Sequence, residues 1–155
     1  MHSTSNRLKH RSGTTAVEIA LTLPIFGVFM AGLMECGHAM MIVNTLSGAA
    51  RQAARYGSTE NITSAQVITK ATNIAKSAMK CNPTAVVKDA SIFDTAGTDT
   101  SSINYNSLPD IELNTTKTDK LFVVRISVPY DSAAILPPFW IKGMTLTGQA
   151  VMRHE

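Results

Sequence analysis

The sequence predicts an α+β protein, with a long N-terminal transmembrane helix that continues into a small extracytoplasmic domain containing a second helix and an antiparallel sheet. Three observations predict this class. One apolar stretch near the N-terminus is long enough to cross a bilayer, two later stretches repeat apolar residues at helical spacing, and two near the C-terminus alternate apolar and polar residues. A chain of 155 residues has room for one small domain and an anchor.

The apolar stretch predicts the membrane helix. Residues 19–34 carry no charge and residues 14–34 carry only Glu18, a length that fits a hydrocarbon core of about 30 Å. Because basic residues within reach of the bilayer lie only before this stretch, the positive-inside rule predicts a cytoplasmic N-terminus and an external remainder. These basic residues are Arg7, Lys9 and Arg11.

We therefore expect a basic cytoplasmic leader over residues 1–13, a transmembrane and extended helix over 14–57, and an extracytoplasmic α+β domain over 58–155. The leader accounts for the formal net charge of +3, because the other 142 residues carry 11 basic and 11 acidic side chains. This distribution argues against nucleic-acid binding. A secretory signal peptide cleaved after Ala39 is an alternative, although the apolar stretch is longer than usual for one.

Two amphipathic helices are expected beyond the span. The first continues the membrane helix until Gly57, which we expect to end it. Its apolar stripe is Ile42, Leu46, Ala49, Ala50, Ala53 and Tyr56. The second helix is expected over residues 63–80 and ends before Asn82-Pro83. Its apolar face is Val67, Ile68, Ala71, Ile74, Ala75, Ala78 and Met79.

Period-two alternation predicts the strands. Residues 122–130 and 144–153 alternate clearly, and residues 85–93 do so weakly. Pro129 cannot donate a backbone hydrogen bond, so it should lie at a strand end or a sheet edge. Residues 94–119, which are rich in Asp, Thr, Ser and Asn, should form a long polar loop.

Several residue groups have two interpretations each. Cys36 and Cys81 form either one disulfide or two packed thiols, because the spacing of the two helices does not decide between them. Glu35 and His38 are better interpreted as a hydrogen-bonded pair at the outer interface than as metal ligands, since a third ligand is missing nearby. The acids of the polar region lack the spacing of a calcium loop and are expected to be solvated. These acids are Asp94, Asp99, Asp110, Glu112 and Asp119.

The apolar patch Pro137-Pro138-Phe139-Trp140 can cover the sheet edge, contact the membrane surface or meet a partner, and covering the core is our expectation. No catalytic residues, cofactor or metal are predicted. Histidines lie at the chain ends or, for His38, near the membrane, so the sequence offers no credible catalytic triad and we do not expect an enzyme.

Within the span, Pro24 removes one backbone donor and should bend the helix. Gly27 and Gly32 offer close packing against another helix, although they lack the four-residue spacing of a dimerisation motif.

The junction between the leader and the span carries the strongest functional pattern. Gly13 is followed by Thr14 and, five residues after the glycine, by Glu18 at the start of the apolar helix. An acid inside a spanning segment costs on the order of 2.5–3.5 kcal/mol at the bilayer centre and less near an interface, so we expect it to have a function. Alternatively, Glu18 reaches water at the cytoplasmic interface of a plain anchor.

These residues resemble the processing and assembly signal of type IV pilin-like proteins. The residues Glu18 to Pro24, then Glu35-Cys36-Gly37, then Ala49 to Tyr56, are similar in order and spacing to the N-terminal pattern of the TadE/TadG-like family of the tight-adherence pilus system. The C-terminal residues 150–155 also resemble the last strand of that family. The resemblance is strong over residues 11–57 and weak beyond them.

The resemblance implies a minor pilin or pseudopilin of a tight-adherence (Flp-type) pilus, held in the bacterial inner membrane. It implies that a prepilin peptidase cuts after Gly13, and that Glu18 pairs with the new amine of Thr14. Other implied partners are the inner-membrane pilus platform, the major pilin and other pseudopilins. The rival interpretation is a single-pass membrane-anchored binding module that uses the sheet and residues 94–119 as its recognition surface. A third interpretation is a secreted hydrolase released by signal peptidase.

Overall fold

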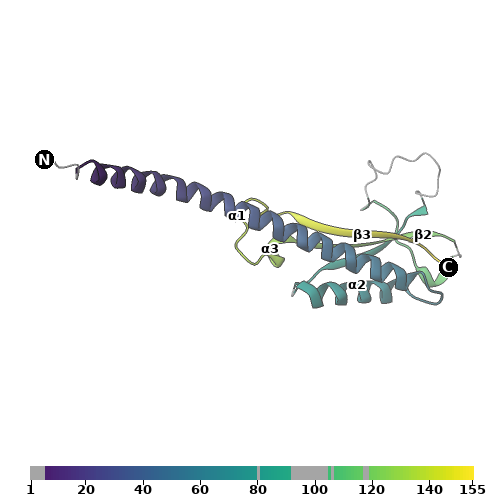
Figure 1. The fold of residues 1–155 in the computed structure, drawn as a ribbon. Coiled ribbons are helices and arrows are strands. Elements are labelled where there is room, and N and C mark those ends of the chain that lie inside the picture. The colour runs from purple at the N-terminus through teal and green to yellow at the C-terminus, as the bar shows by residue number, and fades with distance from the viewer. Residues whose placement is uncertain (1–5, 80, 92–104, 106, 117–118) are drawn as a thin grey trace.

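The computed structural model describes residues 6–79, 81–91, 105, 107–116 and 119–155, with side chains from Gly13 onward. Helix α1 (Asn6–Gly57) is followed by α2 (Ser64–Met79) and β1 (Thr84–Asp89). The 3-10 helix η3 (Leu113–Thr115) precedes β2 (Leu121–Pro129), the short helix α3 (Tyr130–Ala133) and β3 (Thr145–Arg153). The expected α+β class is confirmed, and α1 extends far beyond the domain (Figure 1).

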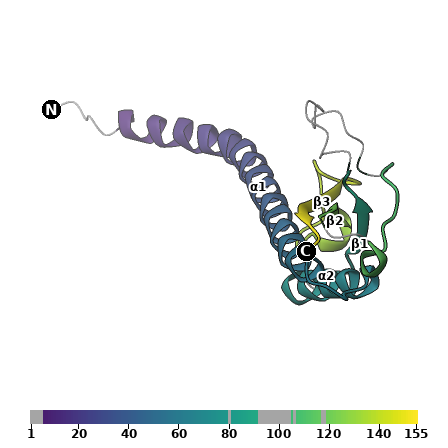
Figure 2. The same ribbon diagram turned by 90° about the vertical axis from the view of Figure 1, so that its right-hand side faces the viewer.

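The three strands form one antiparallel sheet in the order β1-β2-β3. The register pairs Val87 with Val124 across β1 and β2, and Ile126 with Gly148 across β2 and β3. Pro129 is the last residue of β2, as its missing donor requires. One face of the sheet is covered by the C-terminal half of α1 and by α2, which run side by side (Figures 1 and 2).

The core lies between this helical layer and the sheet. The largest fully buried side chains include Ile42 and Leu46 of α1, Val67 of α2, and Phe122 and Ile126 of β2. The sequence predicted these buried positions. Helical spacing predicted them for Ile42 and Leu46, and alternation predicted them for Phe122 and Ile126. The interface stripe of α1 is rich in alanine, which permits close packing against the sheet. Its alanines are Ala39, Ala49, Ala50, Ala53 and Ala54.

The fold differs from the sequence prediction in three places. Helix α1 starts at Asn6, inside the expected leader, because the leader contains good helix formers and its Gly13 does not interrupt the helix. Tyr56 is 37% exposed rather than in the core, and Lys70 of α2 lies over its ring at 5.6 Å from the centroid. Tyr56 lies on the flank of the apolar stripe of α1, where its ring can cover the alkyl stem of a lysine.

The described part of the expected polar loop is also more ordered than predicted. Leu108 and Leu113 are buried, and Asp110 forms a bridge with Lys88 of β1. Leu108 packs with Val123 on the far face of the sheet, so this segment covers a second, smaller apolar cluster. Two leucines among polar residues were too sparse to show periodicity, although each is buried. Residues 94–104 lie outside the described residues.

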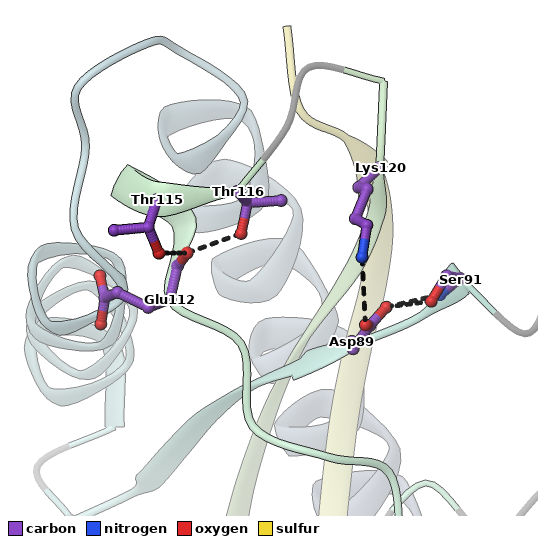
Figure 3. Close-up of polar contacts among 6 residues, drawn as sticks. All are labelled: Asp89, Ser91, Glu112, Thr115, Thr116 and Lys120. Atoms are coloured by element: carbon purple, nitrogen blue, oxygen red, sulfur yellow. Dashed lines mark hydrogen bonds and ion pairs between the residues drawn. The ribbon is translucent and has the colours of Figure 1, made fainter.

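Polar contacts fix this segment to the rest of the domain. The backbone N–H of Ser64 donates to the Glu112 carboxylate at 3.0 Å, and the Ser64 hydroxyl donates to the Ile111 carbonyl at 2.7 Å. Figure 3 shows Thr115 and Thr116 donating to the Glu112 carbonyl, and it shows Asp89 at the end of β1 between Ser91 and Lys120.

Candidate membrane and assembly site

The N-terminal half of α1 carries an apolar surface that the domain does not cover. Every residue from Gly13 to Ala31 is exposed, including Leu21 at 73% and Phe29 at 62%. Burying one such side chain is worth about 1.5–3 kcal/mol, so a row of them in water is strongly unfavourable. The helix is also long and apolar enough to cross a membrane. We call residues 14–34 the exposed segment.

The predicted processing residues lie at the start of this segment. Glu18 is exposed and stands four residues after Thr14, so the two share one face of α1. Helix α1 is continuous through Gly13 and Thr14, whereas a protease binds its substrate in an extended form. Glycine costs about 1 kcal/mol relative to alanine in a helix interior, so Gly13 favours unwinding at this point. Processing itself stays a prediction.

The predicted packing residues fall into two environments. Figure 2 shows α1 bending in its N-terminal half, the region that contains Pro24. A Cβ added at Gly27 would meet nothing within 4 Å, so that surface is open. A Cβ added at Gly32 would lie 3.5 Å from the Trp140 ring, so in this structure the chain's own tryptophan packs there. Packing of these glycines against another helix stays a prediction.

Just beyond the exposed segment, the Glu35 carboxylate binds three consecutive backbone N–H groups of the segment between α3 and β3. Oε1 accepts from Phe139 at 3.1 Å and from Ile141 at 2.9 Å. Trp140 donates to both oxygens, at 3.2 and 3.1 Å. Such a run of N–H groups forms a concave anion site. We call residues 135–142 the clamp loop, because this contact holds it against α1.

The electrostatics of Glu35 follow from these bonds. Desolvation raises the pKa of Glu35, but the hydrogen bonds from Ile141, Trp140 and Phe139 together outweigh it, so the pKa lies below the ordinary value of glutamate. The carboxylate is therefore ionised at neutral pH, which is the state that accepts all of these bonds.

A second contact joins α1 to the start of α3. The Tyr130 hydroxyl donates to the Glu35 carbonyl at 3.3 Å and lies 3.5 Å from Nδ1 of His38. The rings of His38 and Tyr130 are 5.9 Å apart between centroids. Among the described contacts, Glu35 and His38 therefore bind the β2–β3 connection and not each other, which corrects the expected pair. Side-chain direction decides this, because the Glu35 carboxylate points toward the clamp loop and the His38 ring toward Tyr130 of α3.

The patch Pro137-Pro138-Phe139-Trp140 does not cover the core, contrary to our expectation. Phe139 is 78% exposed and Trp140 is 49% exposed, and their rings meet edge to face at 4.9 Å between centroids. The bonds to Glu35 hold this part of the clamp loop on α1, away from the sheet. Figure 1 shows the connection from α3 to β3 beside α1, at the end of the domain from which the exposed segment projects.

The acids of residues 94–119 have separate partners where they are described. Asp110 pairs with Lys88 at 2.7 Å, Asp119 pairs with Arg153 at 2.8 Å, and Glu112 binds Ser64. Asp94 and Asp99 lie outside the described residues. No group of three potential metal-binding side chains occurs among the residues that the structure describes.

Both cysteines are free thiols in the structure, so they form no disulfide there, and of the two only Cys81 is a packed thiol. Cys36 is exposed on α1, whereas Cys81 is buried after α2 and burial raises the pKa of its thiol.

Sequence reasoning missed the partners of Glu35, the contact of Trp140 with Gly32, and the role of Gly148. A Cβ on Gly148 of β3 would lie 2.3 Å from the Ser47 nitrogen and 2.4 Å from the Leu46 carbonyl carbon. The strand thus touches the backbone of α1 there, which only glycine allows. A glycine inside an alternating strand was a signal for such a close approach, but nothing in the sequence named the partner.

The comparison with known families concerns the N-terminal helix. A family model described as TadE-like protein matches residues 13–55, which include the exposed segment and most of the part of α1 that packs on the domain. The resemblance to the TadE-like family is therefore confirmed for this region. No curated protein and no solved structure matches the chain significantly. The TadE-like family is one of pilus components rather than enzymes, and it points to a role in a tight-adherence pilus system.

Proposed function

We propose that the protein is a minor pilin or pseudopilin that takes part in assembling a tight-adherence pilus. The observation that carries this proposal is the division of α1 into two halves. One half packs on the sheet, and the other exposes an apolar surface along its whole length. Such a helix is suited to storage in a bilayer and to packing with the helices of other subunits, while the domain stays outside. The TadE-like match over the same residues supports it.

The orientation of the helix follows from charge. Arg7, Lys9 and Arg11 precede the exposed segment, and the next basic residue is Arg51. The positive-inside rule therefore places the N-terminus in the cytoplasm and the domain on the outer side of the inner membrane. In this proposal a prepilin peptidase removes residues 1–13, and the platform, the major pilin and other pseudopilins are the assembly partners.

Glu18 has a specific role in this proposal. After cleavage, the Thr14 amine and the Glu18 carboxylate lie one helical turn apart, so the amine can neutralise the acid of its own or a neighbouring subunit. Pairing between subunits sets their axial register, because an unpaired acid in lipid is unfavourable. A plain anchor needs no such pairing.

Two measurements on protein from the native host test the proposal. N-terminal sequencing of the membrane-extracted protein should start at Thr14. Gly13→Val should leave the leader attached, because a β-branched side chain blocks the extended substrate. Gly27→Val is the matched control, since an added Cβ at either glycine meets nothing within 4 Å.

The second measurement separates assembly from insertion. Glu18→Gln should reduce pilus formation while membrane insertion and processing persist, because a neutral amide is less costly in lipid than a carboxylate. Glu60→Gln, an exposed acid of the domain, should leave pilus formation unchanged. A mature chain that keeps residues 1–13, with normal pili in Glu18→Gln, would refute the proposal in favour of the anchored binding module.

A further inference from the structure

The clamp loop presents an apolar surface that continues from the exposed segment. Ile135 is 79% exposed, Leu136 58% and Phe139 78%. Trp140 joins them to α1, since its ring lies against Gly32. Between the loop and α1 lies a small cleft of about 150 Å³, lined mostly by apolar side chains. The two apolar surfaces thus form one continuous patch.

The position of the loop along α1 matches the outer boundary of a bilayer. Gly32 lies eighteen positions after Thr14, which is about 27 Å along the helix at the rise of an α-helix, and Glu35 lies about 32 Å along it. If Thr14 marks the inner boundary of a hydrocarbon core of about 30 Å, Trp140 falls at the outer boundary and Glu35 just outside it. Tryptophan is the residue type enriched at that depth.

The contacts of Glu35 fit the same location. Backbone N–H groups that enter the edge of the hydrocarbon lose water partners, so an irregular loop there is stabilised when protein groups accept from its donors. The Glu35 carboxylate satisfies the donors of Phe139, Trp140 and Ile141 together. This explains why an acid directly follows the exposed segment and why the apolar tip of the loop points away from the core.

We propose that the clamp loop is a membrane-interface anchor, in which Ile135, Leu136, Phe139 and Trp140 enter the outer leaflet while Glu35 holds their backbone on α1. The inference rests on the proposed function only in that α1 spans the membrane. Lipid is the favoured occupant over a protein partner because the patch is continuous with the surface that the span presents to lipid, at the depth of the interface. The loop fixes how far the helix projects and which side of the domain faces the membrane.

The chain's single tryptophan makes the test direct. Full-length protein is reconstituted in vesicles of phosphatidylcholine with a minority of phosphatidylglycerol, and Trp140 fluorescence is measured with phosphatidylcholine brominated near the headgroup or near the chain ends. We expect a larger loss of Trp140 fluorescence with the shallow bromines than with the deep ones. Aqueous iodide should quench it less in vesicles than in detergent-free unfolded protein.

A second tryptophan position separates failure of this inference from failure of the span. In a Trp140→Phe background, Phe26→Trp reports the middle of the exposed segment and should be quenched most by the deep bromines. If Phe26→Trp behaves so but Trp140 is quenched by iodide and not by bromine, the loop inference is overturned and the span stands. If neither tryptophan is quenched by bromine, the span fails and the loop inference fails with it. If Trp140 is shielded from both iodide and bromine, another protein copy covers the loop, and the lipid inference is overturned.

The role of Glu35 is tested in the same vesicles. Glu35→Ala should reduce shallow quenching of Trp140, Glu35→Gln should retain part of it through its remaining carbonyl oxygen, and Glu60→Ala should leave it unchanged. Equal quenching in Glu35→Ala and the unsubstituted protein would overturn the assignment of Glu35 as the residue that holds the loop.

Discussion

The contact between Gly148 and α1 gives the sharpest prediction about stability. In Gly148→Ala the new Cβ would lie 2.3 Å from the Ser47 nitrogen and 2.7 Å from the Leu46 Cβ. The first atom and the nearby Leu46 carbonyl carbon belong to the helix backbone, so no rotamer change relieves the overlap. Strand β3 must move away from α1 as a unit, and the sheet follows it.

The size of the effect follows from that movement. An ordinary contact of a Cβ begins near 3.4 Å, so the strand has to retreat by about 1 Å. A gap of that size forfeits a quarter to a half of the dispersion energy of each atom pair across the layer. Overpacking of a core typically costs about 1–3 kcal/mol, and rigid backbone on both sides places Gly148→Ala at the upper end, about 3 kcal/mol.

The assay is urea unfolding of the full chain in a mild detergent. Unfolding is monitored through the loss of protease resistance of the domain. Gly48→Ala is the matched control, because it lies next to Ser47 on α1 and its added Cβ meets nothing within 4 Å. This control should raise the free energy of unfolding by up to about 1 kcal/mol through helix propensity. The same chemical change should thus have opposite signs at two neighbouring sites.

If Gly148→Ala lowers the free energy of unfolding by less than about 1 kcal/mol, the reasoning is refuted. It would mean that β3 and α1 have room for a methyl group and that their close contact does not determine how the sheet packs. A loss in Gly48→Ala as large as that in Gly148→Ala would refute it as well, since the effect would then not depend on the contact.

Two further predictions concern the domain. Gly57→Ala should lower the free energy of unfolding by about 1–2 kcal/mol in the same assay, which is less than the loss in Gly148→Ala. Its Cβ would meet side-chain atoms, which can shift, of Val67 at 2.8 Å, Leu113 at 3.1 Å and Phe122 at 3.3 Å. A loss larger than that of Gly148→Ala would contradict this ranking. Although desolvation raises the pKa of Asp89, the hydrogen bonds from Ser91 and the Lys120 charge outweigh it, so the pKa is lowered. The stability that this carboxylate contributes is present above the unfolded pKa of about 3.9 and is lost as the pH falls through the lower folded pKa. The free energy of unfolding, measured against pH, should therefore fall less on acidification in Asp89→Asn than in the unsubstituted protein. Identical pH profiles would exclude this contribution of Asp89.

Regular elements were predictable because each carries its own period. The alternation of residues 122–130 fixed the face of β2, and the three-and-four spacing that includes Val67 and Ala71 fixed the face of α2. The exposed segment was predictable for a different reason, since its length and its lack of charge are also local properties of the sequence. The processing residues at its start rest on a local motif, which the structure positions but does not test.

The rest of the site depends on contacts between residues far apart in the chain. Glu35 and the clamp loop are separated by more than a hundred residues, and no local pattern in the sequence joins them. The patch around Phe139 had the composition of core, and only its attachment to α1 shows that it faces outward. Tyr56 illustrates the same limit, since a stripe identifies the centre of a buried face better than its flank.

The continuity of α1 has a mechanical consequence. From Pro24 to Gly57 one helix serves both the exposed segment and the core, without an intervening linker. A rod without a joint transmits torque and axial force, so any screw motion imposed on its inner end turns and lifts the sheet by the same amount. The rotation of the domain about the axis of α1 is therefore set by the contacts that hold the inner end of the helix.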